Sequence, residues 1–145
     1  MARSGGRTQR RGIRTQECSE RDARARLNHA RQFLEVAELV AGEGGDREYS
    51  SAAASLAVLA GIAAADAACC KALGRRSRGQ DHRQAADLIE QVEPGGKEAG
   101  STLRRLVALK DEAHYGLFDI RGNDLRAVLR QAHRLVDFAA KVVMR

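Results

Sequence analysis

The segment from Ala52 to Ala65 restricts the fold more than any other part of the chain, because it is apolar on every side of the helix that it predicts. Such a helix has no solvated face and must lie at the centre of a protein. The pattern extends it from about Glu48 to Leu73, with Gly74 as its end. Asp66 interrupts the apolar surface and needs a partner if it is buried. The run is shorter than the roughly 20 residues that cross a bilayer and is mostly alanine, so we expect no membrane span.

The rest of the chain also predicts helices. Alanine, leucine, arginine and glutamate dominate, and there is one proline and no tryptophan. Further helices are predicted at residues 17–41, from an N-cap at Asp81 to about residue 92, from a cap at Ser101 or Thr102 to Tyr115, and from Asn123 to the C-terminus. No segment predicts a strand. We therefore expect an all-α fold, an antiparallel four- to five-helix bundle formed by a single domain at residues 17–145.

The apolar surface of the helix at 48–73 exceeds what one small bundle needs. Part of it is therefore expected to face a second copy of the chain, which predicts a homodimer.

Positive charge is concentrated at the N-terminus. The net charge is +6, and residues 1–16 hold five arginines and no acid. This segment is predicted to be a disordered basic tail, which either attracts nucleic-acid phosphates nonspecifically or is simply solvated. A second basic segment, the predicted loop at 74–80, carries three candidate phosphate contacts, Arg75, Arg76 and Arg78, although a solvated connector is the alternative.

The cysteines favour a reducing environment. Cys18, Cys69 and Cys70 make an odd number, and the two adjacent residues on one helix cannot easily pair with each other. No apolar stretch follows Arg10 and Arg11, so an export signal is not expected. The sequence therefore predicts a cytoplasmic protein, and the excess of arginine over lysine suggests a bacterial source.

Two basic side chains are predicted on the inward face of the helix that ends at Tyr115. At about 100° per residue, Lys110 and His114 fall in the middle of the apolar sector that Leu103 and Leu106 define. Asp111 lies three residues before His114 and could orient its ring. One interpretation is a functional site; the other is that Lys110 reaches solvent and His114 makes one structural hydrogen bond.

The spacing of Asp111 and His114 also matches the carboxylate and histidine pairs of dinuclear metal sites in helix bundles. Such sites require a second pair of the same kind, which the sequence lacks. We therefore expect neither a metal nor a cofactor.

Over residues 48–138 the chain resembles the HEPN family of small helical domains. The resemblance is carried by "SSAAASLAVLAGIAAADAACCKALG", then "GQDHRQAADLIEQV", then "LRRLVALKDEAHYG" and a final amphipathic helix. Members of that family are dimeric bundles that bring an arginine, a polar residue and a histidine from each subunit to one cleft. Many are ribonucleases, often toxins, so the resemblance implies an antitoxin or a nucleotidyltransferase as a partner.

On that resemblance, His114 would be the acid or base, Lys110 the phosphate contact and Asp111 the polar residue of a metal-independent endoribonuclease. In the family motif four to six residues separate the arginine from the histidine, whereas here Lys110 takes the place of the arginine with three residues between. Two alternatives therefore stay open. One is a noncatalytic relative that keeps the dimer and binds a partner protein or nucleic acid, and the other is a protein that binds nucleic acid through its basic tail.

Overall fold

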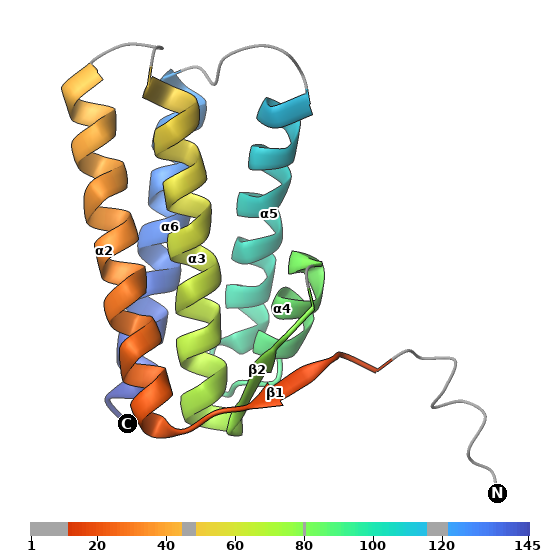
Figure 1. Cartoon of the computed structure of the whole chain (residues 1–145). Helices are drawn as coiled ribbons and strands as arrows, with labels where there is room; N and C mark the ends of the chain where they lie inside the picture. Colours follow the sequence, from red (N-terminus) through yellow and green to blue (C-terminus); the bar gives the residue numbers. More distant parts are fainter. Residues whose placement is uncertain (1–11, 45–48, 80, 116–121) are drawn as a thin grey trace, which may run out of the picture.

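The computed structural model describes residues 12–44, 49–79, 81–115 and 122–145. The side chains at positions 43, 44, 110–115, 122 and 123 lie outside that description, as do residues 1–11, 45–48, 80 and 116–121. The described chain is mostly helical, which confirms the predicted all-α character (Figure 1). Its helices are α2 (Glu20–Gly44), α3 (Ser50–Leu73), α4 (His82–Ile89), α5 (Gly96–Tyr115) and α6 (Gly122–Val143).

Local signals set the ends of several helices. Ser19 and Asp22 cap the start of α2 reciprocally: the Ser19 amide donates to Asp22 Oδ2 at 2.9 Å, and the Asp22 amide donates to Ser19 Oγ at 3.1 Å. Gly74 ends α3 in the left-handed conformation, with φ of 74°, as predicted. Asp81 caps α4, also as predicted, because its side chain accepts a hydrogen bond from the Arg83 amide.

The start of α5 differs from the prediction of a cap at Ser101 or Thr102. The helix begins five residues earlier, at Gly96, after Gly95 with its positive φ of 95°. Thr102 is inside the helix, and its hydroxyl donates to the Glu98 carbonyl at 3.0 Å instead of capping a helix start. The consecutive glycines Gly95 and Gly96 therefore mark the start of α5, and no longer loop separates them from the helix.

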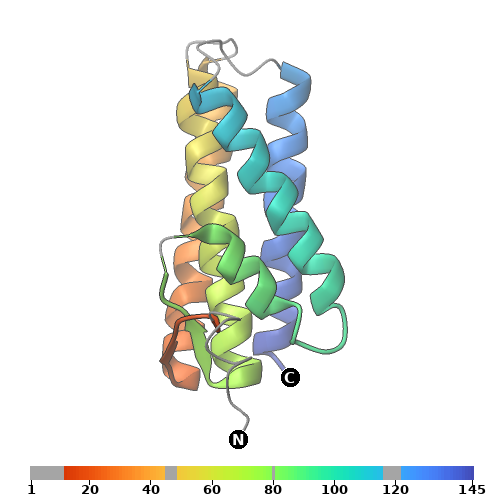
Figure 2. The same ribbon diagram turned by 90° about the vertical axis from the view of Figure 1, so that its right-hand side faces the viewer.

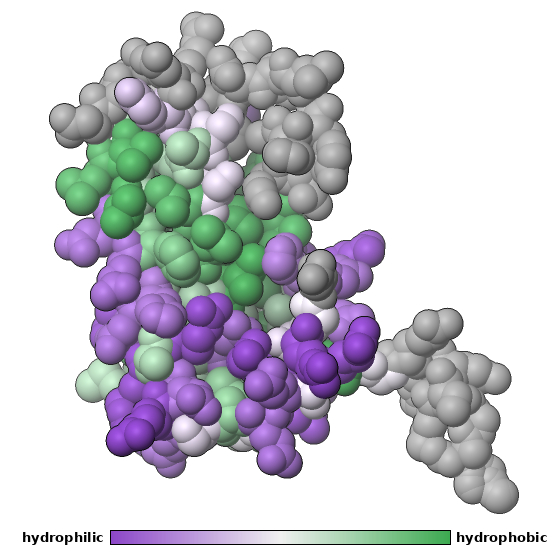
Figure 3. Space-filling model, in the orientation of Figure 1, coloured by the Kyte–Doolittle hydropathy of each residue, from purple (hydrophilic) through white to green (hydrophobic). Residues whose placement is uncertain are grey.

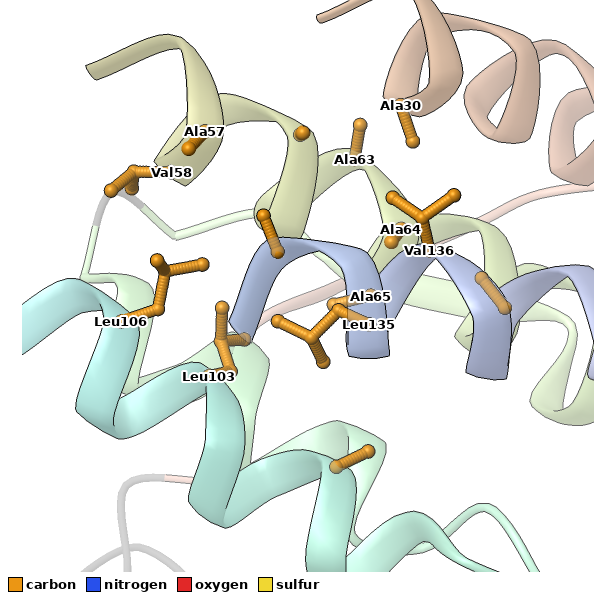
Figure 4. Close-up of a cluster of buried hydrophobic side chains, with 14 of the residues drawn as sticks. Ala30, Ala57, Val58, Ala63, Ala64, Ala65, Leu103, Leu106, Leu135 and Val136 are labelled. Carbon is orange, nitrogen blue, oxygen red and sulfur yellow. The ribbon is translucent and has the colours of Figure 1, made fainter. Parts of the chain in front are cut away.

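The core forms around α3, which packs against α2, α5 and α6 (Figures 1 and 2). Its alanines lie against larger side chains from the neighbouring helices, including Leu103 and Leu106 of α5 and Leu135 and Val136 of α6 (Figure 4). The approach is closest at Gly61, where an added Cβ would lie 2.5 Å from Leu106 Cδ2. Small residues on α3 thus allow neighbouring helices to pack closely, and larger side chains of those helices fill the space beside them.

The expectation that the chain contains no strand is wrong. β1 (Thr15–Glu17) and β2 (Arg75–Ser77) form a two-stranded antiparallel sheet, in which Gln16 is opposite Arg76. The sheet lies at the end of the helical body where α2 begins and α3 ends (Figure 1). Two consequences follow for the predictions: Thr15 and Gln16 of the predicted tail belong to β1, and the predicted loop at 74–80 contains β2.

A disulfide joins Cys18, which follows β1, to Cys70, near the end of α3. It links residues 52 positions apart, with 5.4 Å between their Cα atoms. Cys69 is free and only 2% exposed, and burial raises the pKa of its thiol to about 12. Disulfides occur mostly in oxidising compartments, so this bond gives no support to a cytoplasmic location, which stays a prediction.

Helix α3 is long and apolar enough to cross a membrane, and it is the single such helix within the described ranges. Most of it is buried against the other helices, as in the core helix of a soluble protein.

Candidate phosphate-binding surface

The three predicted catalytic residues, Lys110, Asp111 and His114, lie within the bounds of α5. Their side chains are outside the described residues. The prediction that they form one site therefore stays a prediction, and the site described below is built from other residues.

The predicted phosphate contacts lie on or beside β2. Arg75 donates from Nη2 to Gln91 Oε1 at 3.0 Å, and its Nε is buried with no partner among the described residues. Arg76 donates from Nη2 to the cross-strand Gln16 Oε1 at 3.3 Å. Arg78 is exposed, and its backbone amide donates to the Arg14 carbonyl at 2.9 Å. The sheet therefore brings Arg14 beside the three arginines that the sequence singles out.

We define the strand-end surface as the described residues 12–26 and 71–83, with Asp66 behind them. It contains nine basic and five acidic side chains. Figure 3 shows hydrophilic residues gathered over this end of the molecule. Ion pairs neutralise part of the charge, since Lys71 pairs with Glu20 at 3.0 Å and Arg83 with Asp81 at 3.1 Å.

Six arginines of the strand-end surface form no ion pair with any described residue. They are Arg14, Arg21, Arg24, Arg75, Arg76 and Arg78. Glu17 and Asp22 are the acids of this surface that no described cation pairs with. Hydrogen bonds from the amide and hydroxyl of Ser19 hold the pKa of Asp22 below its usual range, so it stays charged. The strand-end surface therefore carries more unpaired positive charge than unpaired negative charge.

A small hollow of about 190 Å³ lies within this surface, between β1 and the start of α2. Arg26 and Arg76 line it together with Asp22, Glu17 and Cys18. Both signs of charge are present, so the hollow itself is not a strong anion site. The excess cations are Arg75 and Arg76 on β2, Arg14 and Arg78 beside the strands, and Arg21 and Arg24 on the first turns of α2.

A partly buried ion pair, with its carboxylate on the inner side, adjoins the hollow. Arg26 donates to Asp66 Oδ2 from Nε at 3.2 Å and from Nη2 at 2.9 Å. This is the partner that the sequence requires for Asp66, which is 6% exposed. Burial raises the pKa of Asp66 even though Arg26 lowers it in part. Arg26 is thus committed to the fold, whereas the six arginines without an ion pair to a described residue keep their charge exposed to other partners.

Sequence analysis singles out the arginines of β2 but not Arg21 and Arg24, which lie in the predicted helix at 17–41. No local motif links them to β2, because the strand pairing joins segments about 60 residues apart in the sequence. One available signal was Ser19 and Asp22 at capping-box spacing, which places the start of α2 after residue 19. Within the described part of the chain, no three His, Cys, Asp or Glu side chains are placed to hold a metal ion.

Comparison with protein-family models finds no match for the chain. Comparison with curated proteins also finds no similar sequence.

Proposed function

We propose that the protein is a HEPN-like helical bundle that binds RNA through the strand-end surface. The observation that carries this proposal is the set of six arginines, on and beside the β1–β2 sheet, that form no ion pair with the part of the chain that the structure describes. Guanidinium groups form paired hydrogen bonds with phosphate oxygens, and the release of counterions from the nucleic acid favours such contacts at low salt. Four more arginines in residues 1–11 precede this surface in the sequence and extend its charge.

The arrangement fits a nonspecific phosphate contact better than base recognition. Tyr49, Tyr115, Phe33, Phe118 and Phe138 are the only aromatic residues of the chain, and none is in the segments that form the strand-end surface. Base stacking on aromatic rings is the usual source of affinity for unpaired bases. Affinity is therefore expected to come from the backbone phosphates and to vary little with RNA sequence.

RNA binding is tested by fluorescence anisotropy with a labelled single-stranded RNA over a series of salt concentrations. The test variant is Arg14→Gln/Arg78→Gln, because both side chains are exposed and form no hydrogen bond or ion pair with described residues. The matched control is Arg31→Gln/Arg130→Gln, which removes the same charge from exposed positions on α2 and α6. Loss of two phosphate contacts reduces the slope of log K against log salt by about 1.4.

The control pair should leave that slope unchanged. If the test and control double variants weaken RNA binding equally, RNA affinity depends only on the net charge of the protein. The strand-end surface would then have no special role.

A second candidate function is self-association, as in a noncatalytic dimerisation module. Helices α2 and α3 expose large apolar side chains, among them Leu39 at 63% and Leu59 at 45%. Figure 3 shows an apolar area over the upper parts of these two helices. We propose that a second copy of the chain covers it. Leu39→Glu/Leu59→Glu is then expected to be monomeric by light scattering, while the parent is a dimer at the same concentration.

Catalysis is a separate part of the proposal. In the HEPN-like reading, His114 transfers a proton, Lys110 contacts phosphate, Asp111 is the polar neighbour, and the RNA 2′-hydroxyl is the nucleophile in a reaction without a metal. His114→Ala is expected to lose cleavage of a mixed RNA pool while it keeps binding. A His114→Ala protein as active as the parent would leave RNA binding without catalysis. An antitoxin or nucleotidyltransferase partner and a cytoplasmic location stay predictions.

A further inference from the structure

A groove of about 390 Å³ lies between the first half of α5 and the second half of α6, away from the strand-end surface. Its floor consists of the buried residues Ala99, Thr102 and Leu135. Phe138, which is half-buried, forms part of its wall at the Gly95 end. The neighbouring course of the two helices is visible in Figure 2. The volume is in the lower part of the range for small-molecule sites, so one ring system with one anionic group is the size that fits.

Two guanidinium groups line this groove from different helices. Arg105 of α5 and Arg134 of α6 are exposed, and neither forms a hydrogen bond or ion pair with a described residue. The contrast with Arg104, the preceding residue of α5, is informative. Arg104 donates to Asp87 Oδ1 at 2.5 Å and to Glu90 Oε2 at 2.6 Å, so its charge is used to hold α4 against α5. The fold thus neutralises one arginine of this helix and leaves its neighbour free in a groove.

The other lining residues indicate which chemical groups of a ligand would lie next to its anionic group. Phe138 offers an aromatic face, and Ala99 and Leu135 offer apolar contact. Glu98 lines the same groove without an ion pair to either arginine, so its carboxylate is available to accept a hydrogen bond from a hydroxyl or amino group. The Thr102 hydroxyl already donates to the Glu98 carbonyl and can only accept from a ligand.

We propose that this groove binds a small phosphorylated molecule that carries a planar ring, of mononucleotide size. Arg105 and Arg134 hold the phosphate, the ring lies against Phe138, and Glu98 accepts from a polar group of the ligand. Guanidinium groups suit a phosphate because their planar fork matches two of its oxygens. The site is independent of RNA binding at the strand-end surface, since the two share no residue.

Isothermal titration calorimetry with AMP, adenosine and inorganic phosphate separates the contributions of ring and phosphate. AMP is expected to bind more tightly than either fragment. Arg105→Gln and Arg134→Gln should each weaken AMP at least about tenfold, because each removes a charge-assisted contact. Phe138→Leu should weaken AMP and leave inorganic phosphate unchanged. The control Arg31→Gln removes the same charge from an exposed position on α2 and should leave AMP affinity unchanged.

Amide chemical-shift changes in NMR spectra locate the binding. The expected changes upon AMP addition lie in residues 95–105 and 134–138, and the Arg14→Gln/Arg78→Gln variant should show the same changes. Both groove arginines are exposed and unpaired, so their variants should melt at the parent's temperature. Three results would overturn the proposal: no AMP binding at millimolar concentration, shifts confined to the strand-end surface, or AMP affinity that survives loss of both groove arginines.

Discussion

Replacement of Arg26 by methionine should destabilise the fold strongly, because it leaves the Asp66 carboxylate buried without its partner. Two hydrogen bonds, at 2.9 and 3.2 Å, end on one Asp66 oxygen, and Asp66 is 6% exposed. Loss of one partner of a buried pair costs about 3 to 5 kcal/mol. Arg26 is itself partly exposed, so we expect the lower end, about 3 kcal/mol. For a chain of this length the melting temperature should fall by about 6 to 12 °C.

The effect should depend on pH in a defined direction. Burial raises the pKa of Asp66 above its unfolded value, so the folded chain binds more protons than the unfolded chain. The free energy of unfolding therefore falls as the pH rises from the ordinary carboxyl pKa of about 4 through the raised folded value. Without Arg26 the raised pKa moves further up. The destabilisation by Arg26→Met should then be about 3 kcal/mol at pH 8 and smaller, about 1 kcal/mol, at pH 4.5, because protonation of Asp66 at lower pH removes the uncompensated charge.

Urea unfolding followed by circular dichroism at the two pH values measures these differences. Asp66→Asn keeps an acceptor oxygen for Arg26 and removes the buried charge, so it should change stability by less than about 1 kcal/mol at pH 8. The double variant Arg26→Met/Asp66→Asn should be more stable than Arg26→Met alone, because it leaves no buried charge without a partner. Arg24→Met, two residues earlier on α2 and without an ion pair, is the control and should stay within about 0.5 kcal/mol of the parent. A loss from Arg26→Met that is equal at both pH values would refute the reasoning.

Three further predictions concern the cross-link, the free thiol and a tight helix contact. Cys18→Ser should lower stability by up to about 4 kcal/mol in a chain-entropy estimate, since the bond to Cys70 closes a loop of 52 residues; a parent protein with three titratable thiols after oxidative refolding would contradict the pairing. Cys69 should not react with a thiol reagent in the folded protein and should react after unfolding without reductant, because it is buried with a pKa of about 12. Gly96→Ala should destabilise by about 1 to 3 kcal/mol in thermal melts, because its Cβ would meet a backbone carbonyl of α4. Gly42→Ala, with open space around it, should instead stabilise by about 0.5 to 1 kcal/mol.

The bounds and the central position of α3 could be predicted closely from the sequence, because a helix of this composition is stable only at the centre of a fold. An apolar surface in every direction requires burial, and Gly74 ends the helix with a conformation that other residues rarely adopt. The sheet could not be predicted in this way. Its strands have three residues each and are mostly polar, so neither shows the alternation that identifies longer strands. Their pairing depends on the packing of α2 against α3, which is a property of the whole fold.

Prediction of the candidate sites was limited for a similar reason. A helical wheel identifies which residues share a face of one helix, and it places Lys110 and His114 on the apolar face of theirs. It does not show which arginines lack acidic partners: Arg104 and Arg105 are neighbours in sequence, and among the described residues Arg104 meets carboxylates, on α4 and at its end, while Arg105 meets none. The groove with Arg105 and Arg134 requires two helices in place. Charge that is left unpaired is visible only after the tertiary structure is known.

The bond between Cys18 and Cys70 has a consequence for damage to the chain. It encloses the whole of α2 and most of α3 in one covalent ring. A protease that cuts anywhere inside that ring opens it without releasing a fragment, so the two pieces stay in one molecule until a reductant reaches the sulfurs. The arginine-rich N-terminal segment thus remains tethered to the central helix after a single cleavage between residues 18 and 70.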